Sequence, residues 1–197
     1  MGLHYISILE NSRRPAIELC VEYDLSEYSH CTRHEYIDLM RVISQIVAER
    51  TAPNRRRSIE ENGCMIHCFA RSEGFAAVII SKDYPSLAVH AILSKVMDEF
   101  IAIQGNGTPI TQADVESEDY EIETEFPALR KYLCNFQDPS QVNNISAIQR
   151  DLDENKILKH RTLNAVLERG QKIDDLIANS SDLHQDPFVS PSCDMIY

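Results

Sequence analysis

The stretch CMIHCFARSEGFAAVIIS, residues 64–81, decides the fold of the first part of this chain. It consists of two apolar runs, residues 64–71 and 75–81, on either side of the turn Ser72-Glu73-Gly74. Two runs of strand length that are joined by a short glycine-containing turn are typical of a β-hairpin. The sequence therefore predicts an antiparallel pair of strands here.

Further elements lie on both sides of the hairpin. Residues 3–9 and 16–22 alternate between the two faces of a strand. Residues 34–50, 86–101 and 127–133 carry apolar side chains at helical spacing. The order strand, strand, helix, hairpin, helix, helix predicts an α+β domain in which helices cover an antiparallel sheet. We expect this domain to occupy residues 1–135.

The composition limits the class of partner. The chain has 197 residues, of which 43% are hydrophobic, a net charge of -12 and an isoelectric point near 5.0. Nucleic acid is bound through basic clusters that contact phosphate, so this charge argues against nucleic acid as a partner. The one basic run, Arg55–Arg57, is interpreted as a solvated loop rather than a docking patch for anionic lipid or an acidic partner.

The sequence carries no signal for export or membrane insertion. No segment approaches the roughly 20 apolar residues of a membrane-spanning helix. The basic residues near the N-terminus follow the apolar part, the reverse of a secretory signal. We therefore expect a cytoplasmic location, where the six cysteines are reduced thiols.

Clusters that could carry chemistry have structural interpretations. Cys64, His67 and Cys68 are closely spaced, but strand residues three apart point to opposite faces, which separates Cys64 from His67. Residues 105–108 lack the Gly-Lys-Ser/Thr ending of a phosphate loop and are interpreted as a turn. The acidic residues of 116–125 are interpreted as a solvated loop. We expect no metal, no cofactor and no catalytic residue, so the chain is not expected to be an enzyme.

A second pattern begins after residues 136–140, a linker in which Pro139 disfavours helix for the residue before it. Over residues 141–185, alternating steps of three and four residues trace a heptad seam. The seam consists of Ile145, Ile148, Leu152, Asn155, Lys159, Thr162, Val166, Arg169, Ile173, Leu176, Ser180 and Leu183. We expect one long coiled-coil helix, followed by an irregular tail over residues 186–197.

Arg169 lies near the centre of this seam, within VLERGQKIDDL, residues 166–176. A buried guanidinium needs hydrogen-bond acceptors. Self-pairing would bring two Arg169 side chains together in a dry interior. Partner helices with amide carbonyls at the same level would instead satisfy the guanidinium and fix the register. The seam therefore indicates a bundle with different helices.

Several segments resemble a known family, the R-SNAREs. The likeness is specific in Leu152-Asp153-Glu154, in VLERG (166–170) and in QKIDDL (171–176). The organisation of the first 135 residues resembles a longin domain. Four further segments resemble the Ykt-type, lipid-anchored subgroup of the family: RSIEENG (57–63), ARSEG (70–74), KDYP (82–85) and FQDPSQ (136–141).

The resemblance implies a profilin-like longin domain, with helices on both faces of its sheet, followed by the SNARE coiled-coil helix. Arg169 would be the zero-layer residue of a four-helix bundle with three Q-SNARE helices. The protein would dock and fuse vesicles in ER, Golgi and endosomal transport, cycling between the cytoplasm and the cytosolic face of these membranes.

The resemblance also implies a closed form, in which the longin domain folds back over its own SNARE motif. Leu39, Met40 and Ile43 would line the hydrophobic groove that receives the motif. Plain core packing is an equal interpretation of Leu39.

The chain departs from the family pattern in three places. Lys159 occupies a seam position that is usually apolar in the family. Pro187 ends the seam early, and Cys193 is followed by four residues, so a prenyl transferase would find no cysteine in the last four. Lipidation of Cys193 is then the remaining route to peripheral membrane attachment. One alternative function is that of a truncated, soluble R-SNARE, which acts as a regulator or decoy of Q-SNAREs. Another is acyl transfer on a cysteine.

Overall fold

The computed structural model describes residues 2–26, 28–29, 32–106, 126–141 and 157–167. In chain order the elements are β1 (Gly2–Glu10), β2 (Ile17–Tyr23), α1 (Arg33–Glu49), β3 (Arg55–Glu61), β4 (Cys64–Ala70), β5 (Phe75–Lys82), α2 (Ser86–Asn106), α4 (Ala128–Asn135), β6 (Ile157–His160) and the short 3-10 helix η4 (Leu163–Ala165).

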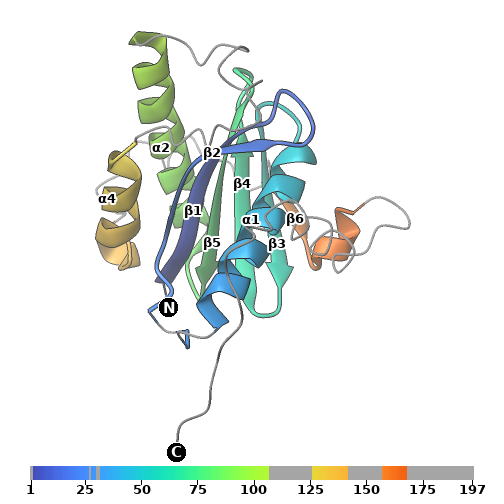
Figure 1. Ribbon diagram of the computed structural model, residues 1–197, viewed down its shortest axis with the longest axis vertical. Coiled ribbons are helices and arrows are strands. Elements are labelled where there is room, and N and C mark those ends of the chain that lie inside the picture. The colour runs from blue at the N-terminus through green and yellow to red at the C-terminus, as the bar shows by residue number, and fades with distance from the viewer. Residues whose placement is uncertain (1, 27, 30–31, 107–125, 142–156, 168–197) are drawn as a thin grey trace, which may run out of the picture.

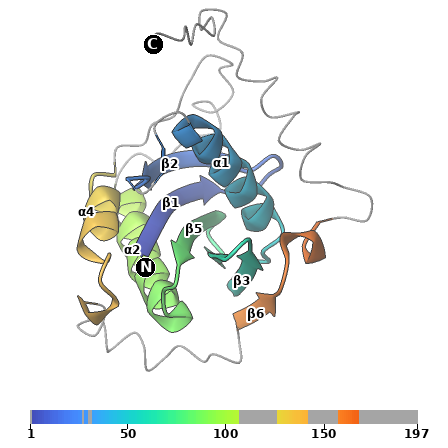
Figure 2. The same cartoon turned by 90° about the horizontal axis from the view of Figure 1, so that it is seen from below.

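The strands form a six-stranded sheet in the order β2-β1-β5-β4-β3-β6 (Figure 1). The first five strands pair antiparallel, whereas β6 pairs parallel with β3. Helix α1 covers one face of the sheet, and α2 and α4 cover the other (Figure 2). The strands β1 and β5 are buried almost throughout because both of their faces are covered.

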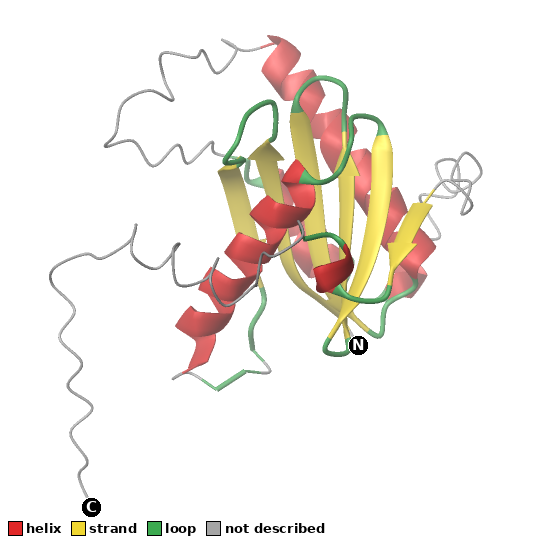
Figure 3. Cartoon of the chain, turned by 90° about the vertical axis from the view of Figure 1, so that its right-hand side faces the viewer, coloured by secondary structure: helices red, strands yellow, loops and turns green. Residues whose placement is uncertain are grey.

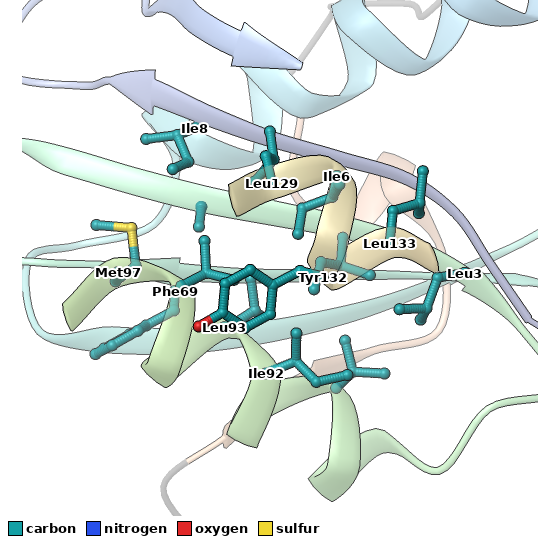
Figure 4. Packing of buried hydrophobic residues seen from close by; sticks show 14 of the residues in the cluster. Leu3, Ile6, Ile8, Phe69, Ile92, Leu93, Met97, Leu129, Tyr132 and Leu133 are labelled. Carbon is teal, nitrogen blue, oxygen red and sulfur yellow. The ribbon is translucent and has the colours of Figure 1, made fainter. Parts of the chain in front are cut away.

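Each face of the sheet has its own hydrophobic core. The core under α2 and α4 contains Phe100 with residues of β1, β4 and β5. Figure 4 shows part of this core, with Ile6 of β1 and Leu93 of α2 among the labelled side chains. The core under α1 contains Tyr5, Met40 and Val47. Neighbouring residues of β4 divide between the two cores, Phe69 toward α2 and Cys68 toward α1, as the two-residue period of a strand requires. This alternation separates His67 from Cys64 and Cys68, as the sequence predicts.

The structure confirms the elements predicted for the first domain. The hairpin of β4 and β5 is present, and Gly74 in its turn has φ of +85°, a backbone conformation that glycine adopts without strain. The two N-terminal strands and the helices α1, α2 and α4 also lie within a few residues of their predicted ranges. The α+β fold, with helices on both faces of the sheet, is therefore confirmed.

The interpretation of Arg55–Arg57 as a solvated loop is wrong, because these residues begin β3. The guanidinium carbon of Arg56 lies 3.6 Å from the centroid of the Phe69 ring. Arg56 also donates hydrogen bonds to the main-chain oxygen of His90 at 3.1 Å and to Ser94 Oγ at 2.9 Å. Burial, with nearby Arg71 as a second cause, lowers the pKa of Arg56 to about 10. The guanidinium thus stacks on the aromatic ring and is held by hydrogen bonds to α2. The turn predicted at residues 105–108 is also wrong at its start, since α2 extends through Asn106.

The prediction of one continuous helix over residues 141–185 does not hold where the structure describes that range. Residues 157–160 form β6, and residues 163–165 form η4. The seam positions Lys159, Thr162 and Val166 are therefore in a strand, a turn and a short helical turn, and the sheet is mixed rather than fully antiparallel. The remaining seam positions and the tail lie outside the described residues, namely Ile145, Ile148, Leu152, Asn155, Arg169, Ile173, Leu176, Ser180, Leu183 and Cys193.

The substitution Phe100→Ala tests the core under α2. The Phe100 ring is buried and meets Phe75 and Phe126 edge-on at centroid distances of 5.4 and 5.6 Å. We expect urea unfolding to show a loss of about 3–5 kcal/mol in the free energy of unfolding. The control Ile103→Ala removes an exposed side chain from the same helix and should change this value by less than about 0.5 kcal/mol. Equal losses in both variants would contradict the assigned core.

Candidate functional site

The candidate site is the contact between the α/β domain and the segment of residues 157–167. In the parallel pairing of β3 with β6, Arg57 lies opposite Leu158 and Ser58 opposite Lys159. Ile59 lies opposite His160. β6 thereby covers the edge of β3 that would otherwise be the edge of the sheet, where unpaired backbone groups invite pairing with other strands.

Beyond β6, the segment turns onto the face of the sheet that carries α1 (Figure 3). Leu163 is fully buried and Val166 is 7% exposed. Both belong to the same hydrophobic cluster as Met40 and Ile43, and Leu39 is partly buried against that cluster. The segment is therefore part of the core under α1 and not a separate element.

Two polar contacts accompany this apolar burial. The backbone N–H of Leu163 donates a hydrogen bond of 2.7 Å to Glu61 Oε2 at the end of β3. Arg57 Nη1 lies 3.2 Å from His160 Nε2, and Arg57 also donates through Nη2 to the main-chain oxygen of Arg50. Burial lowers the pKa of Arg57, and burial together with the adjacent Arg57 lowers the pKa of His160. The segment around the turn between β6 and η4 is thus tied to β3 through Arg57 and Glu61.

On the opposite face, beneath β3, lies a buried polar cluster. Ser58 Oγ is 2.9 Å from His67 Nδ1 and 2.9 Å from His90 Nε2. The two imidazole rings meet edge-on with centroids 5.2 Å apart. Burial lowers the pKa of His67 to about 4. Burial, then His67, Arg56 and Lys159, lower the pKa of His90 to about 2. Both histidines are therefore neutral at neutral pH and serve packing.

The structure brings together only some of the predicted site residues. Met40, Ile43 and Val166 share one cluster, whereas Lys159 and Thr162 are exposed. The role of Leu39, Met40 and Ile43 as a groove for the SNARE motif stays a prediction. Arg169 and the other seam residues named above lie outside the described part of the chain.

Sequence reasoning missed the residues that make most of this contact. Ile157 and Leu163 are buried although neither is a seam position. Arg57, Glu61 and His160 supply the polar contacts. The available signal was that Ile157 and Leu163 are apolar residues which the heptad pattern leaves on the outside of the expected helix. Such residues indicate that the segment buries a face other than the seam.

Comparisons with known proteins identify the family. A family model described as Longin, the regulated-SNARE-like domain, matches residues 25–137. The chain is 36% identical over 184 residues to the synaptobrevin homolog YKT6 of Eremothecium gossypii, covering 93% of this chain and 90% of that relative. Identity to the homologue of Schizosaccharomyces pombe is 37%, with 93% and 89% coverage. Identity to that of Saccharomyces cerevisiae is 34%, with 93% and 90% coverage. The chain belongs to the longin-domain, Ykt-type R-SNARE family.

Family membership places this longin SNARE in vesicle trafficking. Within the ranges that the structure describes, none of its helices combines the length and apolar character needed to cross a bilayer. The same ranges hold no group of three or more histidine, cysteine or acidic residues that could bind a metal ion. The structural feature that stands out is the contact of residues 157–167 with the longin domain.

Leu163→Ser tests whether apolar burial holds this segment. The side chain is fully buried, so its removal should weaken docking by about 2–4 kcal/mol. We expect hydrogen exchange to quicken in residues 157–167 and to stay slow in β5. The control Leu158→Ser alters a side chain of the same segment that is 49% exposed, and should leave exchange unchanged. Docking that is insensitive to Leu163→Ser would contradict the assigned contact.

The buried histidines predict acid sensitivity of the longin domain itself. Their pKa values in the folded state lie below the ordinary value of 6.5, so the unfolded chain binds more protons. Stability is fully present above about pH 6.5 and decreases as the pH falls toward 4, by about 2 kcal/mol for each histidine at pH 5. Urea unfolding at a series of pH values measures this loss. His67→Asn keeps a hydrogen-bonding atom for Ser58 but cannot be protonated, so it should remove the part of the pH-dependent loss in unfolding free energy that comes from His67. A pH dependence equal to that of the native chain would contradict the assigned role of His67.

Proposed function

We propose that this SNARE contributes one helix to a four-helix bundle with three Q-SNARE helices, and that bundle formation docks and fuses vesicles in ER, Golgi and endosomal transport. The protein acts without enzymatic activity, in the cytoplasm and at the cytosolic face of these membranes, with Cys193 as a candidate for lipidation. Arg169, at the centre of the heptad seam, is the residue that selects the partners.

The chemistry of Arg169 supports partners that differ from this chain. A guanidinium has five N–H donors and no acceptor. Inside a bundle it is stabilised only if the facing helices carry acceptors at the same level, such as the amide oxygens of glutamine. Val166 and Ile173, one step before and after it in the seam, would exclude water from these hydrogen bonds.

The observation that carries the proposal is that residues 157–167 belong to two different patterns, the heptad seam of residues 141–185 and the set of residues buried on the longin domain. The seam uses Lys159, Thr162 and Val166, and the contact with the longin domain buries Ile157, Leu163 and Val166. A segment that existed only to complete the longin domain would have no reason to follow a heptad repeat. A segment that existed only as a coiled-coil helix would have no reason to be apolar at Ile157 and Leu163.

The two patterns describe states that exclude each other. A residue cannot be at once in a strand of the longin sheet and in a helix of a bundle, and Val166 is buried in both. We therefore propose that the free protein is closed, with its own longin domain as the first partner of the SNARE motif, and that Q-SNARE helices bind the open state. Partner binding then shifts the population toward the open state by the difference in its affinity for the two states.

Assembly with cognate Q-SNARE helices tests the bundle. We expect circular dichroism of the mixture to show a gain in helicity over the sum of the free components, and a complex that melts cooperatively. Arg169→Leu should lower the melting temperature, because the facing glutamine side chains would be left buried without a donor. It should also relax the choice among partner helices.

Leu163→Ser is the matched control for this experiment, since Leu163 lies outside the seam. It should speed assembly by opening the closed state and leave the melting temperature of the complex near that of the native protein. The proposal fails if no Q-SNARE combination gives a gain in helicity, or if Arg169→Leu forms the same complexes with the same stability. Lipid mixing between liposomes then distinguishes a SNARE that drives fusion, which accelerates mixing, from a regulator or decoy, which slows it.

A further inference from the structure

The contact between β6 and β3 contains a hydrogen bond whose chemistry fixes the charge of one residue. Arg57 Nη1 lies 3.2 Å from His160 Nε2. Because arginine can only donate, His160 Nε2 must be the acceptor, and its lone pair must be free of a proton. A proton on this nitrogen would remove the acceptor and bring two cations into contact. The hydrogen bond therefore exists only with neutral His160.

We propose that the β3–β6 contact is a proton-sensitive latch, which holds the SNARE segment on the longin domain while His160 is neutral and releases it when His160 is protonated. The latch is a property of the free chain. Its meaning as a control on SNARE assembly rests on the function proposed above.

The surroundings of His160 favour the neutral form. From β3, Arg57 faces the imidazole, and the carboxylate of Glu61 at the other end of the turn already accepts the N–H of Leu163. Helix α1 ends close by, where the main-chain oxygen of Arg50 accepts from Arg57. On β4, the buried Cys68 thiol lies near Arg57 and is neutral, since burial raises its pKa to about 12. Burial thus lowers the pKa of His160, and Arg57 is the charged group that lowers it further.

Linkage gives the direction of the effect. Burial and Arg57 lower the pKa of His160 when β6 is docked, and release of β6 returns the imidazole to water and to its ordinary pKa. The released state therefore binds more protons. Closure is fully favoured above the ordinary imidazole pKa of about 6.5 and weakens as the pH falls through the lower pKa of the docked state.

His160 can titrate without unfolding the domain, unlike the other two histidines of this region. It is partly exposed on the outermost strand of the described sheet, while His67 and His90 are buried between the sheet and α2. Their pKa values of about 4 and about 2 place their protonation well below the ordinary range of histidine. While the domain is folded, both imidazoles therefore stay neutral at mildly acid pH, although the stability of the domain decreases over the same range.

Nuclear magnetic resonance of the full chain, without partners, tests the latch. A titration from about pH 7.5 to about pH 5 follows the imidazole of His160 and the amide signals of β6, with the amide signals of α2 as a reference for the intact domain. We expect the ratio of docked to released β6 to fall several-fold on acidification, by at most about tenfold per pH unit for one proton. The α2 signals should keep their folded positions over this range.

Two substitutions at His160 should lock the latch, one in the docked state and one in the released state. Neither alters a seam position. His160→Gln supplies an amide oxygen for Arg57 and cannot be protonated, so β6 should stay docked across the titration. His160→Lys places a permanent cation against Arg57, so β6 should be released already at neutral pH, with α2 unchanged.

The proposal is overturned if His160→Gln releases β6 with the pH dependence of the native chain, or if His160→Lys leaves β6 docked. It is also overturned if α2 loses its folded signals together with β6, since the transition would then be unfolding of the domain. None of these readouts involves Q-SNARE helices. A failed latch and a failed bundle are therefore distinguishable.

Discussion

The outer edge of β3 is the constraint on which the function-bearing part of this structure depends. An open strand edge exposes a row of backbone donors and acceptors that will pair with any suitable strand. Here the edge is paired with residues 157–160 of the same chain. Because that segment also overlaps the proposed heptad seam, covering the edge and exposing a SNARE motif would be conflicting demands on the same residues.

The proposed conflict gives a reason for the lysine at one seam position. A coiled-coil seam favours an apolar side chain at position 159, but in the structure Lys159 is exposed on the outermost strand of the described sheet. Lysine on an edge strand discourages pairing with a further strand. The stem of lysine can still lie along apolar surface in a bundle while its ammonium group reaches water. Lysine at position 159 is therefore compatible with both the docked strand and the proposed bundle helix.

The sequence predicts the longin fold because the signals for it are local. A hairpin needs two apolar runs and a turn, and α1 needs only a 3.6-residue period, so both are visible without knowledge of distant residues. β3 was missed because the packing of Arg56 on Phe69 depends on a strand that lies next to it only in the folded domain. The folded-back segment was missed because its burial depends on tertiary contacts with β3 and with the core under α1, which a heptad count along the chain does not reveal.

A closed state of this kind must be weak enough to be opened. Burial of Ile157, Leu163 and Val166 favours docking, and the conformational entropy lost in ordering the segment opposes it. The free energy of docking is thus a difference between opposing terms of similar size. A single hydrogen bond, worth about 0.5–1.5 kcal/mol, then changes the open fraction several-fold. Polar contacts such as those of Arg57 and Glu61 can therefore regulate the segment, whereas in the core of the domain they would only add to its stability.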